Sequence, residues 1–113
     1  DIDKKSIEIA KSNAQRAGVS DIVAFEVADA REFRRETSCG LIVTNPPYGE
    51  RIMEKKEAEE LYRAFGRAFR ALEDWKLYLL PSHTEFELNF GETADRKRKL
   101  YNGMIKCDLF MYL

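Results

Sequence analysis

Several features that commonly indicate a function are scarce in this sequence of 113 residues. Cys39 and Cys107 are too few for a disulfide framework and lack the spacing of metal ligands, so no metal site is expected. His83 is the only histidine, which excludes any mechanism that needs two. No apolar run approaches the roughly 20 residues of a membrane-spanning helix, and no signal-peptide pattern is present. The sequence therefore predicts a cytoplasmic protein without a membrane partner.

Closely spaced glycines are also missing. The six glycines never lie two positions apart, so the sequence contains no G-x-G loop that could hold a cofactor or a phosphate. There is no initiator Met, and Asp1-Ile2-Asp3 resembles the end of a strand. We therefore expect the chain to be the C-terminal piece of a larger protein that supplies the first strand and its glycine-rich turn.

What is present is an alternation of strand and helix patterns. Strands are expected at 21–27, 40–45 and 76–81, the second of them buried. Helices are expected at 4–17, about 54–72 and 82–90, with a helical turn within 28–33. The last helix would begin at a capping box, Ser82 to Glu85, and the final stretch places Asn102-Gly103 between two strands of a hairpin.

This alternation predicts an α/β fold with a mostly parallel sheet and helices on both faces. The C-terminal hairpin would add antiparallel strands. The arrangement is typical of the Rossmann-like fold of S-adenosylmethionine-dependent methyltransferases, of which this chain would contain a part.

Three expected strand ends carry polar residues, and ligands of such sheets bind at the carboxyl ends of the strands. At the first end, Asp1-Ile2 would bind the cofactor, with the Asp1 carboxylate accepting hydrogen bonds from two ribose hydroxyls. Asp3 is better explained as a helix cap. At the second end, Asp29 would accept from the adenine amino group and Ala30 N–H would donate to a ring nitrogen, although an Asp in this position is often a cap.

The third strand end is followed by Asn45, Pro46, Pro47 and Tyr48, and this run is the most specific signal in the chain. Two prolines fix the backbone and remove two N–H donors, so the turn cannot extend the strand. An exocyclic amine of a base is a poor nucleophile because its lone pair is delocalised into the ring. The Asn45 side-chain oxygen and the Pro46 carbonyl could accept its two N–H bonds, Pro47 would hold these acceptors rigid, and Tyr48 would stack on the base. Asn45 is also expected to bind the cofactor, because a neutral side chain suits a sulfonium whose positive charge is lost on transfer.

The sequence "NPPY" resembles the signature of enzymes that methylate an exocyclic nitrogen of adenine, guanine or glutamine. With "TNPPYGERI", "AKSNAQRAGV", "FEVADARE" and "KLYNGMIKCDLFMYL", the chain more narrowly resembles the THUMP-domain-containing RNA methyltransferases. This family includes the 23S ribosomal RNA N2-guanine methyltransferases. The resemblance implies that residues 1–113 are the C-terminal part of the catalytic domain, without the first strand, the glycine-rich motif and the THUMP region.

The resemblance also implies a cofactor, S-adenosyl-L-methionine, and an RNA partner, ribosomal rather than transfer RNA. Guanine N2 in 23S rRNA is the expected target, although the motif itself equally permits adenine N6. Two alternatives remain: an N6-adenine DNA methyltransferase and a noncatalytic domain of the same fold. The basic run 96–99 would bind RNA or form a solvated strand face. The fragment by itself is expected to bind cofactor weakly, to be inactive and to be capable of self-association.

Overall fold

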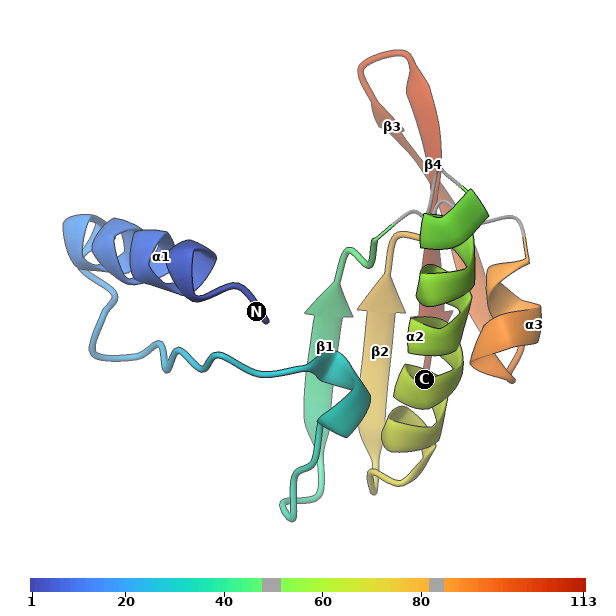
Figure 1. The fold of residues 1–113 in the computed structure, drawn as a ribbon, viewed down its shortest axis with the longest axis horizontal. Coiled ribbons are helices and arrows are strands. Elements are labelled where there is room, and N and C mark those ends of the chain that lie inside the picture. The colour runs from blue at the N-terminus through green and yellow to red at the C-terminus, as the bar shows by residue number, and fades with distance from the viewer. Residues whose placement is uncertain (48–51, 82–84) are drawn as a thin grey trace. The chain divides into compact units, whose positions relative to one another are not determined.

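The computed structural model describes residues 1–47, 52–81 and 85–113. Within it the chain forms two compact units, Asp1–Phe33 and Arg34–Leu113, and each is described by itself. Figure 1 shows one long helix in the first unit and a sheet with its helices in the second.

The first unit contains α1, Lys4–Ala17, and the short 3-10 helix η1, Ala30–Glu32. Asp3 is the N-cap of α1 and its Oδ1 accepts from Lys5 N at 3.1 Å. Gly18 ends the helix with φ 74°, a left-handed conformation that glycine adopts without steric cost. The expected helix and its cap are confirmed.

The strand expected at 21–27 does not form in the structure. In the part of the chain that the structure describes, Asp1 alone forms a strand-like pair with this stretch: its nitrogen donates to Glu26 O at 3.3 Å, and Ala28 N donates to Asp1 O at 2.9 Å. This is the pattern of neighbouring parallel strands, but it extends over a single residue. The prediction was wrong because a strand requires a continuous partner, whatever its β-propensity.

The second unit is built on one mixed sheet of order β1-β2-β4-β3, with β1 and β2 parallel and the other neighbours antiparallel. Its elements in chain order are β1 Gly40–Thr44, α2 Ile52–Arg70, β2 Trp75–Leu79, α3 Phe86–Phe90, β3 Arg96–Asn102 and β4 Ile105–Tyr112.

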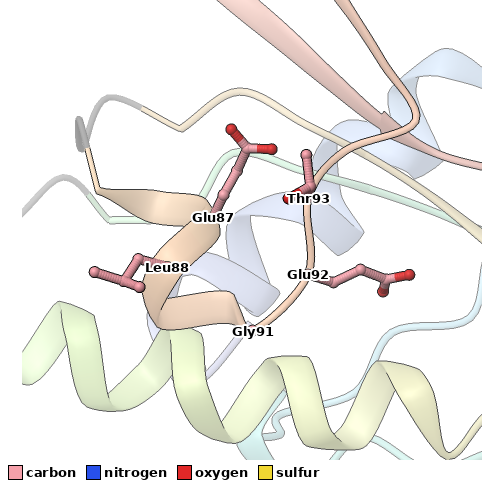
Figure 2. A pocket seen from close by; sticks show the side chains of 5 residues that line it. All are labelled: Glu87, Leu88, Gly91, Glu92 and Thr93. Carbon is pink, nitrogen blue, oxygen red and sulfur yellow. The ribbon is translucent and has the colours of Figure 1, made fainter.

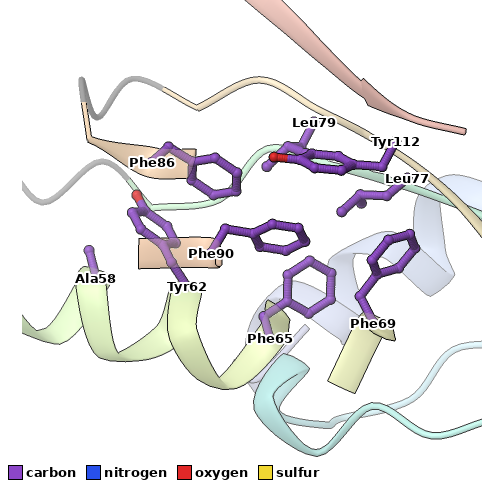
Figure 3. Packing of buried hydrophobic residues seen from close by; sticks show 9 residues of the cluster. All are labelled: Ala58, Tyr62, Phe65, Phe69, Leu77, Leu79, Phe86, Phe90 and Tyr112. Carbon is purple, nitrogen blue, oxygen red and sulfur yellow. The ribbon is translucent and has the colours of Figure 1, made fainter. Parts of the chain in front are cut away.

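An aromatic core joins α2 and α3 to one face of this sheet (Figure 3). Its members are Ala58, Tyr62, Phe65, Phe69, Leu77, Leu79, Phe86, Phe90 and Tyr112. The helices approach closely at Gly66, where a Cβ would overlap the backbone carbonyl of Phe90. The expected core positions Phe65, Phe69, Phe86 and Phe90 are confirmed.

Strand β1 was expected to be buried, but its face that points away from the aromatic core is exposed. Ile42 packs against the core, but Leu41 is 55% and Val43 is 73% exposed. The reason is geometric: successive side chains of a strand point to opposite faces, and α2 and α3 cover only one of them.

The ends of two later elements are shifted from their expected positions. Asn102 pairs with Ile105, so the hairpin turn consists of Gly103 and Met104 rather than Asn102-Gly103. Helix α3 begins at Phe86 with Glu85 as N-cap and no side-chain cap bond, while Ser82 of the expected capping box lies outside the described residues. Among the described residues, no helix is long and apolar enough to cross a membrane.

Candidate functional site

The Asn45–Pro47 turn leaves β1 at the carboxyl edge of the two parallel strands. The ladder continues to this edge, since Leu80 N donates to Thr44 O at 3.3 Å. Asn45 and Pro47 are exposed and Pro46 is half-buried. The turn therefore presents its polar groups where ligands of α/β sheets bind.

A buried tyrosine of α2 anchors this turn by a hydrogen bond. The hydroxyl of Tyr62, a side chain that is only 1% exposed, donates a hydrogen bond to the Pro47 carbonyl. The Tyr62 ring packs edge-on against Phe86 at 4.9 Å between centroids, so the hydroxyl is fixed by the aromatic core. The role of Tyr62 was not predicted from the sequence. Its signal is the spacing of Ala58, Tyr62, Phe65 and Phe69, which places the tyrosine within the apolar helix face.

The two carbonyls of the Pro-Pro pair differ in their bonding. Pro47 O accepts from Tyr62, whereas no hydrogen bond from a described residue reaches Pro46 O. Asn45 is exposed and also interacts with another part of the protein. The predicted acceptors Asn45 and Pro46 thus stand next to each other on a fixed backbone. The predicted stacking residue, Tyr48, lies outside the described residues.

The predicted cofactor residues Asp1 and Ile2 belong to the first unit and are exposed. Asp1 Oδ1 accepts from Asp3 N at 2.8 Å, which ties the carboxylate to the start of α1. No donor in the described part of the chain reaches the other oxygen, Oδ2. An exposed carboxylate with an available acceptor fits a ribose diol, which offers two O–H donors.

Asp29 and Ala30 lie next to Asp1 within the same unit, because Asp1 pairs with the backbone at Glu26 and Ala28. Asp29 is the N-cap of η1 and accepts from Arg31 N at 2.9 Å. It also receives the Arg31 guanidinium, with Nη2 to Oδ2 at 2.6 Å. The Arg31 side chain, followed by its backbone N–H, holds the pKa of Asp29 below the usual range. Asp29 is therefore an ionised acceptor at neutral pH, and the cap role that the sequence left open is realised.

A shallow hollow of about 360 Å³ lies beside α3 and is lined by Glu87, Leu88, Gly91, Glu92 and Thr93 (Figure 2). Both charged side chains are acidic, so the hollow would repel a phosphate. Glu87 is also committed to structure, since Oε2 accepts from Ala94 N at 2.8 Å and Oε1 pairs with Lys97. The hollow is not part of the candidate site.

The geometry at the carboxyl edge agrees with a match to a known family. Residues 1–110 match the model of the RMKL-like methyltransferase domain. The chain belongs to this family. The predicted family resemblance and fold class are thereby confirmed, and the mixed sheet is part of a Rossmann-like methyltransferase domain.

Two relatives and one solved structure place the chain within the family. It is 45% identical over 112 residues to YpsC of Bacillus subtilis (strain 168), whose name proposes an RNA methyltransferase. It is 38% identical over 113 residues to the ribosomal RNA large subunit methyltransferase K/L of Shewanella amazonensis (strain ATCC BAA-1098 / SB2B). The crystal structure of SMU.472, complexed with SAH, matches with a TM-score of 0.91 and 39% identity.

These matches extend along the whole of this chain but not of its relatives. The alignments cover 99% of the chain in all three cases, 29% of YpsC, 16% of the Shewanella enzyme and 30% of SMU.472. The chain therefore corresponds to less than a third of each of these proteins. The roles of Asn45, Pro46, Pro47, Tyr48, Asp1, Ile2, Asp29 and Ala30 remain predictions.

Proposed function

We propose that the protein containing this chain transfers a methyl group from S-adenosylmethionine to an exocyclic amino group of a base in RNA. The observation that carries the proposal is the Asn45–Pro47 turn: two adjacent acceptors at the carboxyl edge of the sheet, anchored through Pro47 to the buried Tyr62. Methyltransferase relatives that act on large-subunit ribosomal RNA, and a neighbour bound to SAH, support the reaction class.

In this mechanism the chain's residues position the amine and do not remove its proton in advance. Asn45 Oδ1 and Pro46 O accept the two N–H bonds, which favours a pyramidal nitrogen and directs its lone pair away from the turn. Rigid acceptors need no reorganisation during the reaction, and this is the property that makes such groups effective. S-adenosylmethionine, when bound, would supply the methyl group as its S–C bond breaks and neutral S-adenosylhomocysteine leaves, and the methylated amine would lose its extra proton to solvent.

The cofactor site would be formed by Asp1, Ile2, Asp29 and Ala30. Asp1 would accept from the ribose hydroxyls. Asp29, whose two oxygens each accept two contacts from Arg31, would exchange part of these contacts for the adenine amino group. The Ala30 N–H would donate to the adenine ring. These residues lie on neighbouring backbone segments, which is the arrangement that one nucleoside requires.

Guanine N2 in 23S ribosomal RNA is the target that we favour. An Asn oxygen and a Pro carbonyl recognise an amino group but not the ring that bears it, so the motif cannot choose between guanine and adenine. The choice of ribosomal RNA is supported by the Shewanella relative, which is named for the large ribosomal subunit. Tyr48 stacking would stabilise a target base extruded from its stem by about 1–3 kcal/mol.

The test uses the intact protein, methyl-labelled cofactor and three substrates: 23S rRNA from a strain lacking the gene, transfer RNA and duplex DNA. Mass spectrometry of the digested nucleosides should find labelled N2-methylguanosine in the ribosomal RNA and little label in DNA. Labelled N6-methyladenine without N2-methylguanosine would contradict the guanine assignment but keep the methyltransferase. No label in any substrate would leave the noncatalytic alternative.

A further inference from the structure

The hairpin of β3 and β4 extends beyond the rest of its sheet at the carboxyl edge of β1 and β2. The last pair between β2 and β4 that involves the end of β2 is Leu79 with Phe110. Because β4 is antiparallel to β2, its residues before Phe110 continue past the carboxyl end of β2. Residues 105–109 pair only with β3, and at about 3.3 Å per residue they reach roughly 16 Å beyond that edge. Figure 1 shows this projection above β1 and β2.

We call residues 98–109 the hairpin arm. The Asn45–Pro47 turn leaves β1 at the same carboxyl edge past which the arm extends. Both lie in the second unit, so their common edge follows from the strand register alone. A substrate long enough to pass the turn would meet the arm.

Most exposed charged side chains of the arm are basic, and one exposed side chain is aromatic. Tyr101 is 70% exposed and faces Lys106, its direct cross-strand partner. Lys99 lies on the same strand face as Tyr101, and Arg98 lies on the other; both are exposed. At the turn, Met104 is fully exposed. Large apolar groups gain nothing from exposure to water, so their presence at a projecting tip suggests a partner.

The charge of the arm contrasts with that of the whole chain. Net charge is −1 overall, whereas the arm, residues 98–109, contains three Lys or Arg and one acidic residue. Lys97, at the base of the hairpin, is paired with Glu87 and lies over the Phe110 ring at 4.8 Å. In the described part of the chain, no side-chain hydrogen bond or ion pair engages Arg98, Lys99 or Lys106, whose backbones pair within the hairpin. Asp108, opposite Lys99, is the one acidic residue of the arm.

We infer that the hairpin arm is an RNA-binding element that holds the strand flanking the target base, with Tyr101 stacking on a base and Lys99, Lys106 and Arg98 contacting phosphates. The combination of an exposed ring with neighbouring cations is what single-stranded RNA requires, since every base offers a π-face and every linkage a negative charge. The inference rests on the proposed function, because it takes RNA as the substrate.

The experiment measures equilibrium binding of the intact protein to 23S rRNA purified from a strain lacking the gene. Tyr101→Ala should weaken binding about tenfold, while Tyr101→Phe, which keeps the ring, should bind as the unchanged protein does. Lys99→Gln with Lys106→Gln should lower the slope of log affinity against log salt by about two, one for each lost phosphate contact.

The matched control is Arg67→Gln with Lys11→Gln, which removes the same charge from exposed helix positions. Arg67 lies in the last turn of α2, at the opposite edge of the sheet. Cofactor affinity and melting temperature should remain unchanged in all variants. If the arm variants bind rRNA as tightly as the unchanged protein, or if the control weakens binding equally, the arm is not an RNA-binding element.

The outcome for the proposed function is measured separately. An unchanged protein that methylates no RNA nucleoside contradicts the proposed function, whatever the arm does. A protein that makes N2-methylguanosine but is insensitive to the arm variants contradicts only the arm. A protein with no affinity for RNA contradicts both.

Discussion

The two predicted sites, one in each unit, are held in place in different ways. The Asn45–Pro47 turn is bonded to Tyr62, which belongs to a core of nine buried residues. The Asp1 and Asp29 carboxylates belong to a unit whose buried apolar residues are only Ile7 and Ala14 among those described. They are held by short-range hydrogen bonds to Asp3 and Arg31. The turn proposed to bind the amine is fixed by packing, whereas the carboxylates proposed to bind the cofactor are fixed by local hydrogen bonds.

This difference predicts how the two sites respond to substitution. Groups held by a packed core can lose a functional side chain without a change of stability, because the backbone keeps its position. Groups held by local hydrogen bonds have less structure beneath them, and exchange of their amide hydrogens should be faster. The following variants test the comparison in the intact protein.

The largest effect is expected for Asn45→Ala. The variant removes one of two amine acceptors, while the prolines and the Tyr62 bond keep the turn in place. Turnover should fall by at least about a hundredfold with an unchanged melting temperature, as for loss of a preorganised polar group. Steady-state kinetics and calorimetry measure the two quantities. Asn13→Ala, on the surface of α1, is the control, and unaltered turnover in Asn45→Ala would exclude the proposed mechanism.

A smaller effect, on binding rather than turnover, is expected for Asp1→Asn. A neutral amide accepts ribose hydroxyls less strongly than a carboxylate does, so cofactor affinity should fall about tenfold. Isothermal calorimetry of the intact protein gives the dissociation constant. Asp21→Asn changes the same charge in the same unit and should have no effect. Equal affinities for Asp1→Asn and the unchanged protein would remove Asp1 from the cofactor site.

Tyr62→Phe tests the connection between the core and the turn. The ring and its contact with Phe86 remain, and only the hydrogen bond to Pro47 O is lost. The free energy of unfolding should decrease by about 1 kcal/mol, and turnover should fall several-fold because the acceptors are less fixed. Tyr78→Phe, on the opposite sheet face, is the control. A Tyr62→Phe enzyme with full turnover would show that the prolines alone hold the turn.

The smallest effect is expected for Glu87→Gln. Burial raises the pKa of Glu87, but the Lys97 bond, the Ala94 N–H and the Lys97 charge together hold it below its usual value. A lowered pKa contributes stability above the unfolded value, near 4.5, and this contribution is lost as the pH falls through the folded value. At pH 7 the variant should be less stable by about 0.5–1 kcal/mol.

Denaturant unfolding at several pH values checks this prediction. The difference between Glu87→Gln and the unchanged protein should shrink as the pH falls from 4.5 through the lower pKa of folded Glu87, below which both side chains are neutral. The control is Glu57→Gln on the exposed side of α2. A difference that is independent of pH would mean that Glu87 acts through packing rather than charge.

From the sequence alone, α1, α2, the strands of the second unit and the turn after β1 could be predicted. Asp3 and Gly18 mark the ends of α1 by local chemistry, and the two prolines enforce a turn wherever they occur. These features depend on residues that are close together in the chain and can therefore be predicted from the sequence. The family could be named for the same reason, since Asn45 to Tyr48 are consecutive.

Tertiary structure decided what depends on distant partners. Residues 21–27 have a strand composition, but the ladder that would make them a strand is supplied by Asp1 alone. The bond from Tyr62 to Pro47 joins residues 15 positions apart. The apolar pattern of the helix indicates that the Tyr62 ring is buried, but not which group its hydroxyl bonds. The reach of the hairpin arm depends on where β4 leaves β2, at Leu79 and Phe110. Pairing register and burial are set by long-range contacts, so they appear only when the chain is folded.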